Sequence, residues 1–260
     1  MRKRQVASPK GDSVRQTSIP IIKTFADVLA MSGLTGESPS QADKKNYAER
    51  FSRNCATLFA NGLRQWFSGV TPNPDGSAQE APARTGKGFK KLDVNYSTSQ
   101  LGLALGVSIK SIHAPDPRTK RFTKNYSRND NELRAEATDY HKRQPYAVLV
   151  GVLFLPESSC TDGGSGDGDE TGVSSFGKAV QYFRHRADRQ VPSDDPELFE
   201  RFFIGVYSAE RASTRFFDVM HAPPRNRKLK VSEGLSFDEV LIEIRETYDR
   251  RNKLKFDWAD

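Results

Sequence analysis

Residues 89–112 read FKKLDVNYSTSQLGLALGVSIKSI, and this stretch decides the fold. Apolar and polar side chains alternate in both halves, which predicts two β-strands joined by a short polar turn. On the first strand Leu92, Val94 and Tyr96 alternate with Asp93, Asn95 and Ser97. One face of the second strand carries Leu101, Leu103, Leu105, Val107 and Ile109, and the other carries Gly102, Ala104, Gly106, Ser108 and Lys110. We expect the apolar face to join a core and the small face to leave room for a bulky ligand.

Two charged residues on these strands suggest a chemistry. If the strands pair as a hairpin, Asp93 and Lys110 share a face near one edge of the sheet. A carboxylate there can hold a hard divalent cation, which polarises a phosphate and activates a bound water. A lysine can stabilise the charge that develops on the phosphorus or orient the water. The pair therefore suits metal-assisted phosphodiester hydrolysis, although such pairs also occur on ordinary sheets.

The flanking segments predict a mixed α/β sheet covered by helices. Residues 41–68 carry an apolar helical face, and a second helix is expected over about 130–144, with Ser127 or Asn129 as its cap. The run YAVLVGVLFL at 146–155 is almost continuously apolar and predicts a strand buried on both faces. A buried strand that follows a crossover helix indicates this architecture.

The order of these elements resembles the PD-(D/E)XK nuclease superfamily, which includes restriction endonucleases. The resemblance covers about residues 42–156; Leu92-Asp93 stands for the Pro-Asp half of the motif and Ser108-Ile109-Lys110 for the (D/E)-X-K half. It implies a restriction-endonuclease-like fold and a Mg²⁺-dependent DNA endonuclease, with Mn²⁺ as a substitute, acting in bacterial restriction or phage defence. It also implies that Asp93 binds the metal, that Lys110 is the catalytic lysine, and that Ser108 occupies the catalytic position that is acidic in the family.

Ser108 is where the chain departs from that pattern, because serine is a poor Mg²⁺ ligand. Either another carboxylate supplies the charge, or the site is inactive. Glu49, on the first helix, is the candidate metal ligand that the resemblance suggests; as an alternative it is a surface glutamate flanked by arginines. Glu132 and Asp218 are weaker candidates: the first also suits the start of a helix, and the second the edge of a strand.

The charge balance favours nucleic acid as a partner. The chain has 260 residues, with 40 Lys and Arg against 33 Asp and Glu, and a net charge of +7. Cations cluster beside the predicted site, where phosphate contacts would supply affinity rather than sequence choice. The candidate DNA contacts are Lys90, Lys91, Arg118, Lys120, Arg121, Lys124 and Arg128. The same residues would also suit solvated loops.

The chain is expected to form a flexible basic arm at 1–18 and a single nuclease-like α/β domain at 19–260. Residues 69–88 are predicted to be a long loop, and the acidic stretch 156–173 a disordered one. Residues 196–203 are expected to begin as a helix or to run straight into a strand, and Ser236 is expected to cap a long final helix. Two cysteines and no apolar run of membrane-spanning length favour the cytoplasm.

Three other functions remain open at this stage. The fold could serve as a catalytically inactive DNA-binding or complex-forming subunit, it could cut RNA, or it could be an interaction module whose basic character is incidental. A homodimer or a partner subunit of a defence system is also compatible with the sequence. The recognition sequence, the cut pattern and any preference for modified DNA are not determined by these residues.

Overall fold

A mixed five-stranded sheet forms the centre of the computed structural model, which describes residues 21–33, 40–85, 88–163, 173–221 and 230–252. The strand order is β3-β4-β5-β6-β7. β4, β5 and β6 run parallel to one another, and the two edge strands are antiparallel to their neighbours. The strands are β3 (Val94–Thr98), β4 (Gly102–Ser111), β5 (Val148–Pro156), β6 (Arg201–Ser208) and β7 (Ser213–Asp218).

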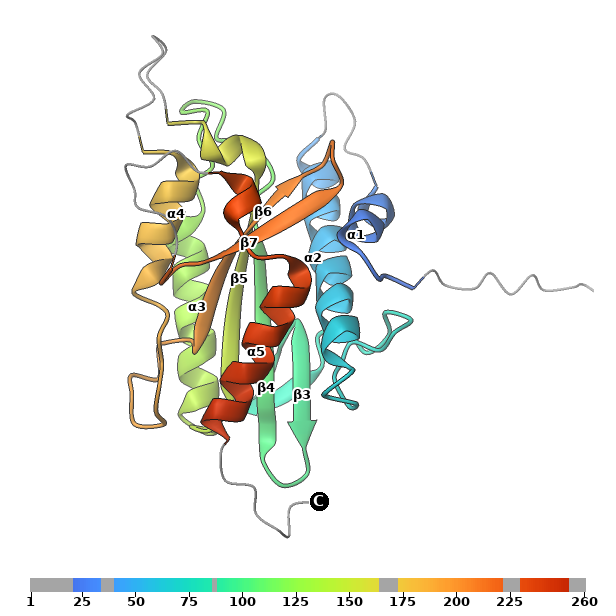
Figure 1. Cartoon of the computed structure of the whole chain (residues 1–260), viewed down its shortest axis with the longest axis vertical. Coiled ribbons are helices and arrows are strands. Elements are labelled where there is room, and N and C mark those ends of the chain that lie inside the picture. The colour runs from blue at the N-terminus through green and yellow to red at the C-terminus, as the bar shows by residue number, and fades with distance from the viewer. Residues whose placement is uncertain (1–20, 34–39, 86–87, 164–172, 222–229, 253–260) are drawn as a thin grey trace, which may run out of the picture.

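Helices cover both faces of this sheet (Figure 1). One face packs against α1 (Phe25–Ser32), α2 (Gln41–Leu63) and α5 (Phe237–Arg251). The other packs against α3 (Tyr126–His141) and α4 (Ser175–Arg184), the crossover helices between the parallel strands. The predicted α/β class, with a mixed sheet flanked by helices, is confirmed.

The central strand β5 shows why the sheet is sandwiched. Val150 and Val152 lie in the core under α2, whereas Leu149 and Leu153 lie in the core under α3 and α4. Both sets are almost completely buried. A strand with apolar side chains on both faces is stable only when helices cover both sides of the sheet, as the sequence predicted.

Helix boundaries follow the capping chemistry in most places. Ser236 accepts a hydrogen bond from the Glu239 N–H at the start of α5, which confirms the predicted cap. The helix predicted over about 130–144 is present as α3, but its predicted start and its predicted cap, Ser127 or Asn129, were wrong. This helix begins at Tyr126, its N-cap residue is Asn125, and the Asn125 side chain makes no capping hydrogen bond.

The stretch 89–112 departs from two simple strands at two points. Its first half is interrupted at Leu92-Asp93, so that Leu92 packs under α3 while Val94 packs under α2. The register between β3 and β4 shifts between Tyr96 and Ser97, which places Leu103 with Leu92. A β-bulge of this kind breaks strict alternation.

The expectation that the small face of β4 leaves room for a bulky ligand was wrong. A Cβ atom added to Gly106 would lie 2.8 Å from Leu92 and 2.9 Å from Leu149. Leu101, expected on the apolar face, is exposed in the turn before β4. Leu92 and Leu149 fill the space above Gly106, so only a residue without a side chain fits there.

Two segments predicted as loops contain structure. Residues 69–88 include β1 (Pro82–Thr85), which pairs with β2 (Gly88–Lys91) as a small antiparallel hairpin. In the stretch predicted to be disordered, residues 157–160 form a 3-10 helix, and Asp162 accepts a hydrogen bond of 2.6 Å from the Ser175 N–H. Residues 164–172 and the predicted arm at 1–18 lie outside the described residues. Residues 196–200 contain no helix and lead directly into β6.

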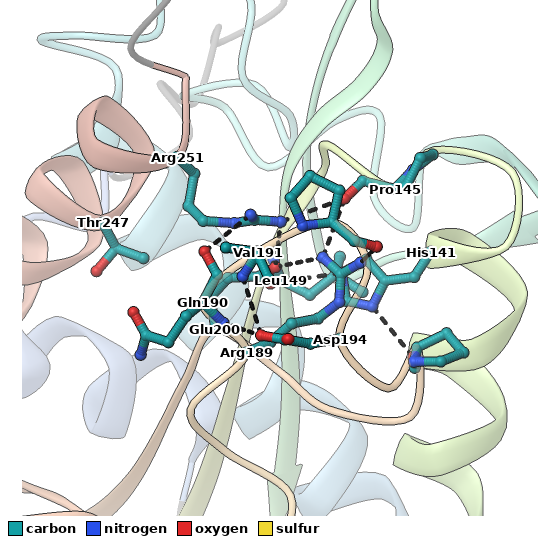
Figure 2. A network of polar contacts seen from close by, with 12 residues as sticks. His141, Pro145, Leu149, Arg189, Gln190, Val191, Asp194, Glu200, Thr247 and Arg251 are labelled. Atoms are coloured by element: carbon teal, nitrogen blue, oxygen red, sulfur yellow. Dashed lines mark hydrogen bonds and ion pairs between the residues drawn. The ribbon is translucent and has the colours of Figure 1, made fainter.

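A buried ionic network joins the elements at the amino ends of the parallel strands (Figure 2). The Glu200 carboxylate accepts hydrogen bonds from Arg189 at 2.9 Å, from Arg251 at 3.2 Å and from the Leu149 N–H at 2.7 Å. His141 Nε2 lies 3.4 Å from the same carboxylate. Both arginines also donate to the Pro145 carbonyl. The network fastens α5 and the loop after α4 to the sheet, which is a structural role.

Candidate functional site

Asp93 and Lys110 lie together at the carboxyl end of β4, as the sequence predicted. Asp93 lies in the two-residue link between β2 and β3. Its carboxylate accepts a hydrogen bond of 2.6 Å from the Ile109 N–H, which fixes it beside the last residues of β4. Each charge affects the other: Lys110 lowers the pKa of Asp93, and Asp93 raises that of Lys110.

Lys110 is held by carboxylates of α3. Its Nζ atom lies 3.2 Å from Glu132 Oε2, and the other Glu132 oxygen accepts a hydrogen bond of 2.9 Å from Arg128. Burial alone would lower the pKa of the ammonium group, but the negative charges of Glu136, Asp93 and Glu132 outweigh that effect and raise the pKa. Lys110 therefore stays charged at neutral pH.

Among these residues, Asp93 is the one whose charged form is disfavoured by its surroundings, and we call it the strained carboxylate. Burial is the largest cause of a pKa raised to about 7, and the charges of Glu136 and Glu80 add to the rise. The Ile109 hydrogen bond and Lys110 oppose it. A carboxyl group that titrates near neutrality is characteristic of functional sites, where nearby charges are not fully compensated.

Glu136 completes what we call the carboxylate–lysine cluster: Asp93, Lys110, Glu132 and Glu136. Its Oε2 atom is buried and has no hydrogen-bond partner among the described residues. Tyr140 lies near this cluster. Burial raises the pKa of its hydroxyl most, and the negative charges of Glu136, Asp139 and Asp93 raise it further. Glu136 was not among the site residues predicted from the sequence. Its spacing of four residues from Glu132, on a crossover helix after the lysine strand, is the signal that could have found it.

The structure does not bring every predicted site residue to this cluster. Ser108 lies on the same face of β4 as Lys110, but only 2% of it is exposed. Glu49 is exposed on α2, beyond the other face of the sheet, where it lies 3.8 Å from Lys45. Asp218 accepts a hydrogen bond of 2.9 Å from Arg201 near the amino end of β6. Neither acid lies with Asp93.

The β1–β2 hairpin packs beside the cluster, against α3, β3 and β4. The Lys90 ammonium lies 2.7 Å from Asp139 and donates to the Ala135 carbonyl, both on α3. Lys91 binds Glu80 at 3.0 Å. These two predicted DNA contacts are therefore engaged in ion pairs that bound nucleic acid would have to share or displace.

The predicted basic segment after β4 divides into paired and unpaired cations. Arg128 binds Glu132, Lys124 lies 3.4 Å from Asp116, and Arg121 lies 4.0 Å from Asp162 and donates to the Val173 carbonyl. Arg118 and Lys120 are exposed and have no acidic partner in the described part of the chain. They are the cations best placed to contact phosphate without breaking an ion pair.

The donor atoms of the cluster fit a hard divalent cation in part. Carboxylate oxygens are what Mg²⁺ prefers, and the Glu136 Oε2 atom has no hydrogen-bond partner among the described residues, although Lys110 lies close enough for the two charges to interact. Among the described residues, no three His, Cys, Asp or Glu side chains are grouped closely enough to hold a metal ion alone. Mg²⁺ is commonly bound by one or two carboxylates together with water and substrate phosphate, and Asp93 and Glu136 are two candidates for that role.

Comparison with protein-family models, with curated proteins and with solved structures finds no match for the chain. Within the described residues, no helix has the length and apolar character needed to cross a membrane.

Proposed function

We propose that the protein is a metal-dependent DNA endonuclease of restriction-endonuclease-like architecture. One observation carries the proposal: a strained carboxylate, Asp93, shares the end of β4 with a charged lysine, Lys110, and with the unpartnered carboxylate oxygen of Glu136. The resemblance of Leu92-Asp93 and Ser108-Ile109-Lys110 to the nuclease motif supports it, as does the mixed sheet between helices. We further propose a cytoplasmic enzyme of restriction or antiviral defence.

In this proposal Asp93 and Glu136 hold Mg²⁺ or Mn²⁺, and Glu136 replaces the acid that Ser108 lacks. The cation, when bound, supplies Lewis-acid activation of the phosphate and of an attacking water. Lys110 stabilises the negative charge that grows on the phosphate oxygens as the bond to the leaving oxygen breaks. Glu132 orients the Lys110 ammonium group through its 3.2 Å contact. Arg118 and Lys120 bind the phosphate backbone outside the site.

A plasmid-nicking assay with Mg²⁺ or Mn²⁺ tests this assignment. Lys110→Ala should slow cleavage by about 10²- to 10³-fold, the usual effect of removing one group that stabilises transition-state charge. Asp93→Asn and Glu136→Gln should abolish metal-dependent cleavage. Lys45→Ala, an exposed lysine on α2, is the matched control and should cut at the wild-type rate. Equal nicking by wild type and Asp93→Asn would refute the site.

A second candidate is a catalytically inactive nuclease-fold subunit that binds DNA or assembles a complex. Two observations favour it: Ser108 replaces an acid, and the described residues contain no group of three metal-ligating side chains. Under this alternative, salt-sensitive DNA binding persists but no divalent metal produces cleavage in wild type. The same nicking assay, combined with a binding titration, distinguishes the two.

A further inference from the structure

A separate cavity of about 600 Å³ opens at the carboxyl ends of β4, β5 and β6. Ser111, Pro156 and Ser208, the last residues of these three strands, line it. The carboxyl ends of parallel strands are a common location of ligand sites in α/β sheets. The volume lies within the range of pockets that hold small organic ligands.

The wall of this pocket contains an aromatic group that the carboxylate–lysine cluster does not use. His113 follows β4, and its Nδ1 atom lies 2.8 Å from the Tyr207 hydroxyl. The Tyr47 ring meets the His113 ring edge to face, with centroids 4.9 Å apart. Burial lowers the pKa of His113 to about 4, so the ring is neutral at physiological pH. Three rings beside a crevice suit a flat, uncharged heteroaromatic group.

His113 also has an unmatched polar atom. Its Nε2 atom is buried and has no hydrogen-bond partner among the described residues. Burying a polar atom without a hydrogen-bond partner is unfavourable, and this carries an energetic cost. A ligand with its own hydrogen-bonding edge, seated against the ring, would offset this cost after a small rotation of the imidazole.

Charges around the mouth of the pocket are arranged for an anionic group at one side. Lys44, on α2, is exposed and lines the pocket. Asn125, at the start of α3, also lines it and leaves the first-turn N–H groups without a side-chain cap. A lysine and an uncapped helix N-terminus favour phosphate. Glu210 lines the pocket as well, and carboxylates commonly bind ribose hydroxyls. Glu157 also lines it, but its carboxylate accepts a hydrogen bond from Arg211.

We propose that this pocket binds one nucleotide: the base against Tyr47, His113 and Tyr207, and the phosphate toward Lys44 and the start of α3. The nucleotide could be free or could be one unit of a nucleic-acid strand. The inference goes beyond the proposed function, because the pocket does not include Asp93, Lys110 or Glu136.

Isothermal titration of the full chain with AMP, GMP, CMP and UMP, in EDTA, tests the site. At least one nucleotide should bind, and ribose 5-phosphate and the matching nucleoside should each bind at least about tenfold more weakly, a difference of about 1.4 kcal/mol. Lys44→Ala should weaken binding by a similar factor. Lys45→Ala, its neighbour on α2, does not line the pocket and should bind like wild type. Ser158→Trp, an exposed lining residue, should block binding, whereas Thr161→Trp should not.

Single-stranded oligonucleotides distinguish the source of the nucleotide. If the site takes one unit of a strand, a 2-aminopurine oligonucleotide should change fluorescence on binding, and Ser158→Trp should remove that change. If it takes a free nucleotide, the monophosphates bind and the fluorescence does not respond. No binding of any monophosphate and no Ser158-dependent fluorescence would overturn the inference, even if the protein nicks plasmid. Nucleotide binding without nicking would leave this inference standing and refute the proposed endonuclease.

Discussion

The raised pKa of Asp93 makes a quantitative prediction about stability. Asp93→Asn removes the charge but keeps the shape and an oxygen that can accept the 2.6 Å hydrogen bond from the Ile109 N–H. In the folded protein the pKa of this carboxyl rises from its ordinary value of 3.8 to about 7. The native state therefore holds the proton more tightly than the unfolded state does, and ionisation destabilises the fold.

The size of the destabilisation follows from the difference between the two pKa values of Asp93. At about 1.4 kcal/mol per pKa unit, the shift corresponds to roughly 4 kcal/mol. Below pH 4 both states are protonated and the penalty is absent. It grows as pH rises from 4 to 7 and is complete above about pH 7. Asp93→Asn should thus match wild type near pH 4 and be more stable by up to about 4 kcal/mol at pH 8.5, an increase in Tm on the order of 10 °C.

Urea unfolding of wild type and Asp93→Asn, at several pH values with EDTA, measures this difference. Mg²⁺ should then narrow it at pH 8.5, since a ligand that binds only the folded wild type stabilises that state. Asp75→Asn is the control of opposite sign: the Ser77 hydrogen bonds lower the pKa of Asp75, so its small contribution is present at neutral pH and lost in acid. If the stability difference between wild type and Asp93→Asn does not change with pH, the raised pKa of Asp93 is refuted.

Three further predictions address the buried network, Ser108 and the basic segment. Glu200→Gln should cost about 3–5 kcal/mol in urea unfolding because two arginines lose their buried counter-charge, whereas Glu243→Gln, at a partly exposed pair, should cost about 1 kcal/mol or less. Ser108→Asp should lower stability in EDTA and regain part of it with Mg²⁺, visible in thermal melts; no response to Mg²⁺ would argue against a cation there. Arg118→Ala with Lys120→Ala should flatten the slope of log K against log salt by about 0.9 for each phosphate that is no longer neutralised, and an unchanged slope would exclude both residues from the interface.

The part of the sheet that could be predicted from the sequence is the part in which every side chain must be buried. β5 has no polar face, so its position between two helical layers follows from its composition. The β3–β4 pair could not be predicted in full. A shift of one position between Tyr96 and Ser97 moves Leu103 to the opposite core from Leu105, and nothing in the local alternation signals a bulge.

The candidate site was predicted in its strand-borne half and missed in its helical half. Asp93 and Lys110 come from adjacent strand segments, whose pairing fixes their proximity. Glu136 depends on where α3 begins and how the crossover places it over the sheet. The helix starts at Tyr126 without a side-chain cap, so capping patterns predicted the wrong start. Glu200 is 51 residues from both Arg251 and Leu149 in the sequence. At that separation, local sequence patterns do not indicate which side chains meet.

The two ends of the parallel strands differ in how they accommodate buried charge. At the amino ends, His141, the Leu149 N–H and Arg189 together outweigh burial and lower the pKa of the Glu200 carboxyl, so ionisation there stabilises the fold. At the carboxyl end of β4, three carboxylates surround one lysine and the pKa of Asp93 is raised: ionisation there destabilises it. Under the proposed function, the unfavourable charge at the carboxyl end is the stability cost of an active site. Glu136 Oε2 and His113 Nε2 at that end lack a hydrogen-bond partner among the described residues, as do His141 Nε2, Arg189 Nε and Arg251 Nε at the other end. Under the two proposals made above, substrate or ligand is expected at the carboxyl ends of β4, β5 and β6.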